Sequence, residues 1–134
     1  MKWFLDALAK YAVFRGRSRR KEYWYFLLFF ALISALLSAL DLLAGTYSSR
    51  YQTGLFTSIF TIATFVPWLA LSVRRLHDIG YSGRWLWVML LGVFAIAVNL
   101  AIGLVIFIVL SIAFAVAAIV DSDSGPNKYG SAPK

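Results

Sequence analysis

The feature that most constrains this chain is a run of uncharged, mostly apolar residues from Trp85 to Val120. A single straight helix through this run would be roughly 54 Å long, whereas the hydrocarbon core of a bilayer is about 30 Å thick. Two further apolar runs, residues 23–44 and 54–73, each have the length of one membrane crossing. Such runs are typical of membrane helices, and we therefore predict an all-α integral membrane protein.

The composition supports a membrane location and excludes several kinds of site. Hydrophobic residues make up 61% of the 134 residues and charged residues 14%, whereas soluble domains carry about a quarter charged residues. The chain contains no cysteine and one histidine, His77, so we expect no disulfide, no metal cluster and no cofactor. The net charge of +7 is explained by basic residues beside the apolar runs, and we expect no binding to nucleic acid.

We predict four membrane helices, at residues 23–44, 54–73, 85–99 and 103–120. The last run must be divided because it exceeds the core thickness, and Asn99–Gly103 is the segment that best tolerates a turn. The last two helices would then form a short hairpin within a four-helix transmembrane bundle. The alternative is one long, tilted or bent helix through residues 85–120.

Basic residues are distributed unevenly among the connecting segments. Ten of them lie in the segment 1–22 and the loop 74–84, against Arg50 alone in the loop 45–53. Because basic loops stay in the cytoplasm, we predict a cytoplasmic N-terminus. The hairpin would also place the polar tail, residues 121–134, and with it the C-terminus in the cytoplasm.

Residues 1–12 have the spacing of a short amphipathic helix, with aromatic and apolar residues on one face and charged residues on the other. Such helices lie at membrane interfaces, where tryptophan and tyrosine are favoured. The alternative is a helix that packs against the cytoplasmic loops. The apolar run that follows is too long for the hydrophobic core of a signal peptide, so we expect it to be retained as a membrane helix.

Three segments together resemble a known family. They are Phe14-x-Gly16-Arg17-x-Arg19-Arg20-x-Glu22-Tyr23-Trp24, Arg74-Arg75-Leu76-His77-Asp78-x-Gly80-x-Ser82-Gly83 and Gly125-Pro126-Asn127-x-Tyr129-Gly130. Their order and spacing, which cover nearly the whole chain, resemble the bacterial inner-membrane family known as domain of unknown function 805. The resemblance implies a small multi-pass protein of the bacterial cytoplasmic (inner) membrane with both termini inside, and it implies no activity.

Candidate binding residues lie in the two basic segments. They are Arg17, Arg19, Arg20, Glu22, Arg74, Arg75, His77 and Asp78. Arginine side chains suit phosphate geometry, and a position beside the membrane favours anionic lipid headgroups. The alternative is that the arginines only orient the chain, while His77 and Asp78 fix the turn between two helices. Glu22 could also bridge to Arg74 or Arg75 and so join the two segments.

Two polar residues of the predicted membrane helices, Asp41 and Asn99, are hypotheses for a functional site. Asp41 is near the outer end of its helix, and we expect it to pair with Arg50 or to face water rather than to relay protons. Asn99 could form a turn or donate a hydrogen bond between helices. The tail segment Gly125–Gly130 has the residues of a tight turn and could dock onto the basic loops.

The sequence contains no catalytic constellation, no metal-ligand spacing and no nucleotide-binding motif. We therefore expect a protein that is not an enzyme and that binds anionic lipid, another membrane protein or a second copy of itself through its cytoplasmic basic face. The first alternative is a small transporter or channel that works as an oligomer, with Asp41 and a stripe of threonines lining the path. The second is an enzyme that acts on lipid headgroups through His77.

Overall fold

The computed structural model describes residues 2–122 and 125–131, without the side chains of residues 89, 90, 92, 93, 96 and 97. The predicted tail therefore lies partly outside the described residues. The described residues form helices and no strand. The helices are α1 (Lys2–Ala9), α2 (Arg20–Leu43), α3 (Leu55–Asp78), α4 (Trp85–Val98) and α5 (Leu100–Ile119).

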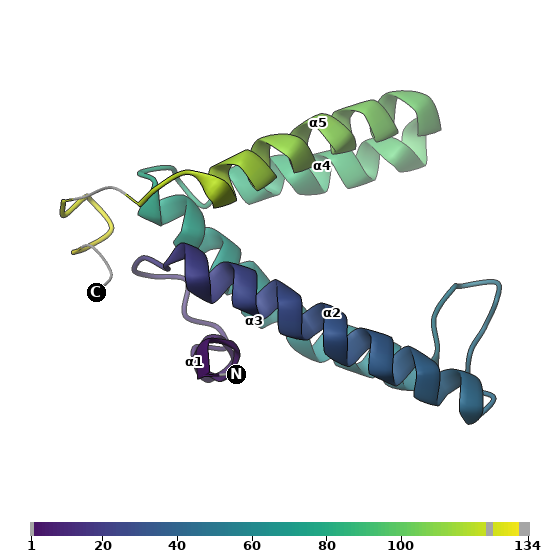
Figure 1. Ribbon diagram of the computed structural model, residues 1–134. Coiled ribbons are helices and arrows are strands. Elements are labelled where there is room, and N and C mark those ends of the chain that lie inside the picture. Colours follow the sequence, from purple (N-terminus) through teal and green to yellow (C-terminus); the bar gives the residue numbers. More distant parts are fainter. Residues whose placement is uncertain (1, 123–124, 132–134) are drawn as a thin grey trace.

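The four longer helices form two antiparallel hairpins that meet at one end and diverge toward the other (Figure 1). α2 packs along α3 and α4 packs along α5, while the two hairpins contact each other where α5 ends. The segments 14–22, 74–84, 119–122 and 125–131 lie at this shared end, which we call the basic end. The loop between α2 and α3 lies at the opposite end, which we call the loop end.

Within the described part of the chain, α2, α3 and α5 are long and apolar enough to cross a membrane. Much of their apolar surface is exposed; Leu36 and Ile62, for example, are 63% and 73% exposed. α4 has 14 residues, which makes it about 21 Å long and shorter than the hydrocarbon core. The predicted four-helix transmembrane bundle is therefore supported in part: the described chain is all-helical, and three of its helices are candidate membrane spans.

The long apolar run is divided at Asn99, whose backbone is extended (φ −148°, ψ 114°). The Asn99 side chain accepts a hydrogen bond from the Ile102 amide at 3.1 Å and so caps the N-terminus of α5. Asn99 is therefore a turn residue, which was one of its two predicted roles. The prediction that the turn continues to Gly103 is wrong, because α5 already begins at Leu100.

The predicted loop 74–84 begins later than expected, because α3 continues to Asp78. Arginine is a good helix former, and no residue before Gly80 interrupts the helix. Gly80 adopts a φ of +79°, the left-handed conformation that commonly ends helices. All four of the predicted site residues between 74 and 78 are thus held on the last turn and a half of a helix rather than on a loop.

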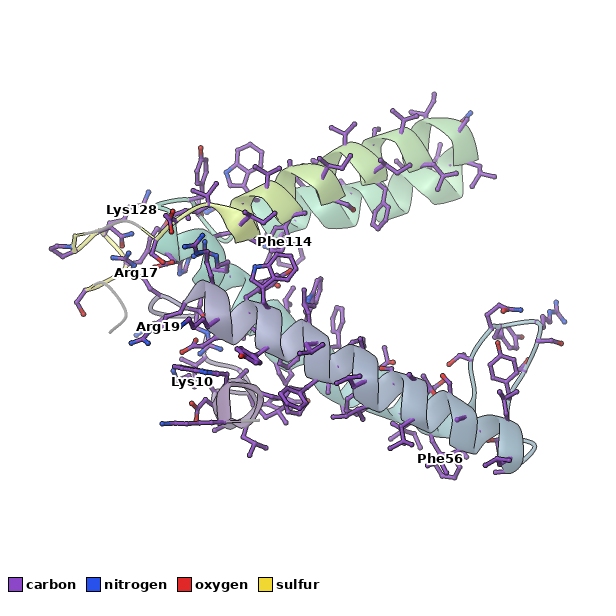
Figure 2. The ribbon with its side chains drawn as sticks, viewed as in Figure 1. Lys10, Arg17, Arg19, Phe56, Phe114 and Lys128 are labelled. Carbon is purple, nitrogen blue, oxygen red and sulfur yellow. The ribbon has the colours of Figure 1, made fainter. Side chains whose placement is uncertain are left out.

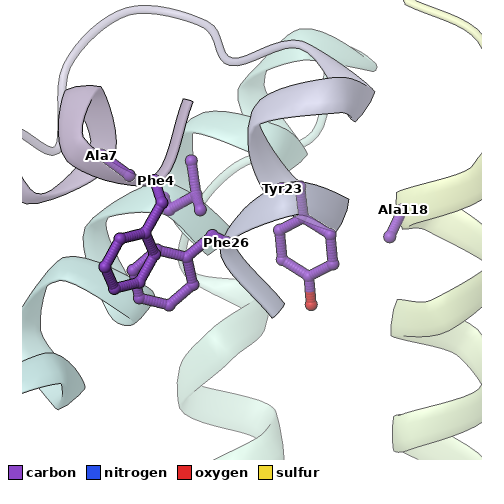
Figure 3. Close-up of a cluster of buried hydrophobic side chains, with 6 residues drawn as sticks. Phe4, Ala7, Tyr23, Phe26 and Ala118 are labelled. Carbon is purple, nitrogen blue, oxygen red and sulfur yellow. The ribbon is translucent and has the colours of Figure 1, made fainter. Parts of the chain in front are cut away.

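A cluster of buried apolar side chains joins both hairpins and α1 near the basic end (Figure 3). It consists of Phe4 and Ala7 of α1, Tyr23 and Phe26 of α2, Leu71 of α3 and Ala118 of α5. The rings of Phe4 and Phe26 stack with their centroids 5.3 Å apart. α1 therefore packs on the α2–α3 hairpin, and its location at a membrane interface remains a prediction.

Candidate functional site

Asp78, the last residue of α3, is the centre of a buried network of ionic hydrogen bonds. Its Oδ1 accepts from Nε of Arg17 at 2.9 Å, and its Oδ2 accepts from Nη1 of Arg75 and from Oγ of Ser122. The side chains of Arg17 and Arg75 are each 1% exposed, and that of Asp78 is fully buried. We call these four residues the Asp78 cluster; it connects the N-terminal segment, α3 and the tail.

The two arginines of the cluster also bind backbone carbonyls of the tail and of α5. Nη1 of Arg17 donates to the carbonyl of Gly125 at 2.7 Å. Arg75 donates to the carbonyls of Ala118, at 3.4 Å, and of Val120. Carbonyls at the end of a helix lack intrahelical partners and carry partial negative charge, so a cation stabilises them. Arg75 thereby fixes the end of α5 against the end of α3.

The tail segment 125–131 folds into a tight turn that docks beside α3, as its turn chemistry suggested. Asn127 and Gly130 exchange two backbone hydrogen bonds of 3.0 Å. The Asn127 amide donates to the His77 carbonyl at 3.0 Å, and the ring of Tyr129 stacks on that of His77 with centroids 3.8 Å apart. Nδ1 of His77 donates to the carbonyl of Gly16 at 3.2 Å, so the histidine links the tail to the N-terminal segment.

Arg74 and Glu22 do not form the predicted bridge. Among the described residues no ion pair joins Glu22 to Arg74 or Arg75, because Glu22 accepts instead from the hydroxyl of Ser18, four residues before it. Arg74 is 2% exposed, and its Nε and Nη2 have no hydrogen-bond partner in the described part of the chain. The two segments are joined there by the backbone, since the Ser18 amide donates to the Arg74 carbonyl at 3.1 Å.

The remaining predicted site residues, Arg19 and Arg20, lie outside the cluster. The guanidinium of Arg19 lies 5.5 Å from the centroid of the Trp3 ring in α1. Arg20 donates to the carbonyl of Ile119 at 2.8 Å and forms an exposed ion pair with Asp121. Both arginines therefore hold neighbouring elements in place at the basic end.

Several other basic residues, at this end or directly after α1, face solvent. Lys10, Arg15 and Lys21 are exposed, and no ion pair involves them within the described residues. We call these three residues the exposed basic set. Figure 2 shows Lys10 and Arg19 beside α1 and α2, with Arg17 and Lys128 nearer the tail. The basic residues of this end therefore divide into those that bind protein, which include the buried Arg17 and Arg75, and those that face solvent without an ion pair in the described part of the chain.

Asp41 is a second buried carboxylate, at the loop end. Its Oδ1 accepts from the Phe56 amide at 2.9 Å, and its Oδ2 accepts from the Thr57 amide at 2.9 Å. The hydroxyls of Thr46 and Thr57 donate to it at 2.6 and 2.8 Å. Because amides at the start of a helix lack intrahelical partners, Asp41 acts as an N-terminal cap of α3 supplied by α2.

The prediction that Asp41 pairs with Arg50 or faces water is therefore wrong. Asp41 is fully buried, and the guanidinium of Arg50 lies over the ring of Tyr51, 5.8 Å from its centroid. Gly54 was not among the predicted residues, although a Cβ atom at this position would overlap Cγ of Asp41. Ser122 was not predicted either, because nothing distinguishes this serine from others in the polar tail.

Comparisons with known proteins place the chain among membrane proteins without an assigned activity. The sequence profile of the family described as "Protein of unknown function (DUF805)" matches residues 11–131. The Escherichia coli K12 protein named "Inner membrane protein YhaI" is 34% identical over 134 residues, which cover 100% of this chain and 97% of that protein. "Inner membrane protein YhaH" of the same strain is 40% identical over 85 residues, or 63% of this chain and 69% of that protein. No solved structure matches.

Proposed function

The chain belongs to the DUF805 family of inner-membrane proteins, and from this premise we propose that it binds anionic lipid headgroups through its exposed basic set without acting as an enzyme. In this proposal α4 and α5 enter the bilayer together as a hairpin and α1 lies at the interface. Both termini and the whole basic end are cytoplasmic. The uneven distribution of basic residues between the basic end and the loop end supports this orientation.

The observation that carries the proposal is the division of the basic residues at the basic end. Arg17 and Arg75 are occupied by Asp78 and by backbone carbonyls, so they stabilise the fold. The exposed basic set has no such partners in the described residues, and it ends at the second residue of a membrane-spanning helix. Basic residues in this position attract anionic headgroups, with a gain of about fivefold in affinity for each residue.

Neutralising the exposed basic set tests the proposal. The variant Lys10→Gln/Arg15→Gln/Lys21→Gln should lose most of its preference for phosphatidylglycerol over phosphatidylcholine, measured by native mass spectrometry after exchange into mixed-lipid nanodiscs. Arg20→Gln/Asp121→Asn is the control at the same end, because it removes an exposed ion pair without changing the net charge. Equal lipid preference in the triple variant and the wild type would refute the proposal.

Two further measurements test the proposed location of the C-terminus and the proposed contact with lipid. A reporter fused after residue 134 should be active in the cytoplasm; activity outside would contradict the proposed hairpin of α4 and α5. Photo-crosslinking in cells from position 15 should give an adduct with the mass of a phospholipid. A discrete protein adduct would mean instead that the same residues bind another membrane protein.

The two alternatives, a transporter or channel that depends on Asp41 and an enzyme that depends on His77, have less support. Both residues make hydrogen bonds or ring contacts within the protein. Within the described residues, all the hydrogen bonds that the Asp41 carboxylate accepts come from its own hairpin, so this carboxylate does not face a transport path there. The His77 ring is stacked on Tyr129 and bonded to Gly16, which leaves it poorly placed to act on a lipid headgroup.

A further inference from the structure

An apolar groove of about 450 Å³ lies at the basic end, beside the Asp78 cluster and apart from the exposed basic set. One wall is formed by Leu76 at the end of α3, Tyr81 in the loop that follows and Trp85 at the start of α4, and the second half of α5 forms the other. Binding sites for small molecules have volumes of about 300–1,000 Å³ and are mostly apolar. The groove therefore has the size and the chemistry of a ligand site.

The sequence of α5 explains why protein does not fill this groove. Ala113 and Ala117 lie one turn apart and both line it, so α5 presents methyl groups where larger side chains would close the space. Phe114, between them, packs against Tyr23 of α2 with ring centroids 5.9 Å apart. Figure 2 shows Phe114 projecting from α5 into the space between the two hairpins.

The residues at one side of the groove indicate its depth in the membrane. Tyr81 and Trp85 are 56% and 54% exposed. Exposed tyrosine and tryptophan on membrane helices lie at the level of the lipid headgroups, where the ring is in an apolar region and the polar atom is hydrated. In the proposed membrane orientation, the wall formed by α5 runs from this level toward the bilayer centre, alongside the lipid acyl chains.

One basic residue supplies a positive charge at the same level. Arg84 directly precedes the first residue of α4, Trp85; its side chain is exposed, and no ion pair involves it within the described residues. A planar guanidinium suits the oxygens of a phosphate group, to which it can donate two hydrogen bonds. An apolar groove with an arginine at the headgroup level is complementary to a phospholipid that carries net negative charge.

We propose that this groove binds one acyl chain of an anionic phospholipid, whose phosphate is held by Arg84. Apolar packing alone does not favour this position over the surrounding bilayer, because lipid tails are as apolar as the groove. Selectivity then comes from the headgroup, and we expect a preference for anionic over neutral lipid of about fivefold, the contribution of one arginine near the membrane surface. The inference rests on the proposed membrane insertion, but it uses none of the exposed basic set.

Tryptophan fluorescence tests the proposal directly, because Trp85 lines the groove. A full-length variant that retains Trp85 alone, with phenylalanine at positions 3, 24, 68 and 87, is reconstituted into vesicles of phosphatidylcholine. Brominated phosphatidylglycerol or brominated phosphatidylcholine, which quench indole fluorescence on contact, is then added in increasing fractions. We expect half-maximal quenching of Trp85 at an approximately fivefold lower fraction of the anionic lipid.

The matched control retains Trp24 alone, which is 43% exposed on α2 and does not line the groove. For this comparison both single-tryptophan proteins also carry the triple glutamine substitution, because Lys21 lies three residues from Trp24. Equal quenching curves for Trp24 and Trp85 would mean that only the ordinary surrounding lipid is sensed, and would overturn the proposal. So would protection of Trp85 from both lipids, which would indicate that a second copy or another protein covers the groove.

Two substitutions separate the groove from the exposed basic set. Arg84→Gln should make the two brominated lipids equally effective at Trp85, and Ala113→Phe should reduce quenching by both, because it fills the groove. The triple glutamine variant of the exposed basic set should leave the Trp85 preference unchanged. Loss of that preference in the triple variant, with no effect of Arg84→Gln, would overturn the groove proposal while leaving the proposed function intact.

Discussion

Two fully buried carboxylates lie at opposite ends of the α2–α3 hairpin, and their partners differ in kind. Asp41 accepts from two backbone amides and two hydroxyls, all in the loop and helix that directly follow it. Asp78 accepts from two arginines and a serine, of which Arg17 is 61 and Ser122 is 44 residues away. Asp41 therefore closes one hairpin, whereas Asp78 joins three distant segments of the chain.

The two environments also balance charge differently. Asp78 compensates two buried guanidinium groups, so removing its charge would leave buried cations without a counterion. Asp41 has no cationic partner among the described residues; the positive end of the α3 dipole and four hydrogen bonds stabilise it instead. The basic end should consequently be more sensitive to substitution than the loop end.

The largest effect is expected from Asp78→Asn. Because an amide cannot compensate Arg17 and Arg75, the free energy of unfolding should fall by about 3–5 kcal/mol. The loss can be measured by reversible unfolding in mixed micelles with increasing dodecyl sulfate, followed by tryptophan fluorescence. The tail should also become susceptible to proteolysis.

Asp121→Asn compares an exposed carboxylate of the basic end with the buried carboxylate of Asp78. Asp121 pairs with Arg20, but its side chain is 83% exposed, and exposed pairs contribute about 0–1 kcal/mol. A stability loss in Asp121→Asn as large as that in Asp78→Asn would show that burial of the cluster does not determine its importance.

At the loop end, the largest effect should come from Gly54→Ala. The added methyl group would overlap Cγ of Asp41, so the carboxylate must move away from the amides of Phe56 and Thr57. Overpacking of this kind destabilises by about 1–3 kcal/mol. Gly125→Ala is the matched control, because a Cβ atom added there would have no described atom within 4 Å; equal losses in both variants would refute this account.

Asp41→Asn should destabilise the protein less than Gly54→Ala. Asparagine keeps the shape of the side chain, but neutral hydrogen bonds are about half as strong as ionic ones. Thr46→Val, which removes one donor to Asp41, should lower the free energy of unfolding by about 1 kcal/mol.

Arg50→Gln should leave the unfolding curve unchanged, because Arg50 does not pair with Asp41. A loss of stability similar to that in Asp41→Asn would instead support the ion pair that was predicted from the sequence.

The contrast between the two carboxylates also shows what the sequence could predict. Apolar runs are local signals, and they located α2, α3, α5 and the division at Asn99. The basic segments identified Arg17, Arg75 and Asp78 as candidates, either to bind a ligand or to orient the chain and fix a turn, but not as partners of one another. Their mutual pairing depends on how the helices pack, and no local pattern encodes a contact with Ser122. Asp41 was misjudged for the same reason, because its partners become neighbours only when α3 folds back against α2.

A smaller loss than at either buried carboxylate is expected where the tail touches the basic end through Tyr129. Its ring stacks on His77, and such contacts contribute about 0.5–1.5 kcal/mol. Tyr129→Ala should therefore weaken tail docking and raise the rate of proteolysis in the tail about fivefold, while global stability changes by less than about 0.5 kcal/mol. Tyr129→Phe keeps the stacked ring and should behave as wild type. If Tyr129→Ala instead lowered stability as much as Asp78→Asn, the turn of the tail, and not the Asp78 cluster, would be the main connection between the three segments.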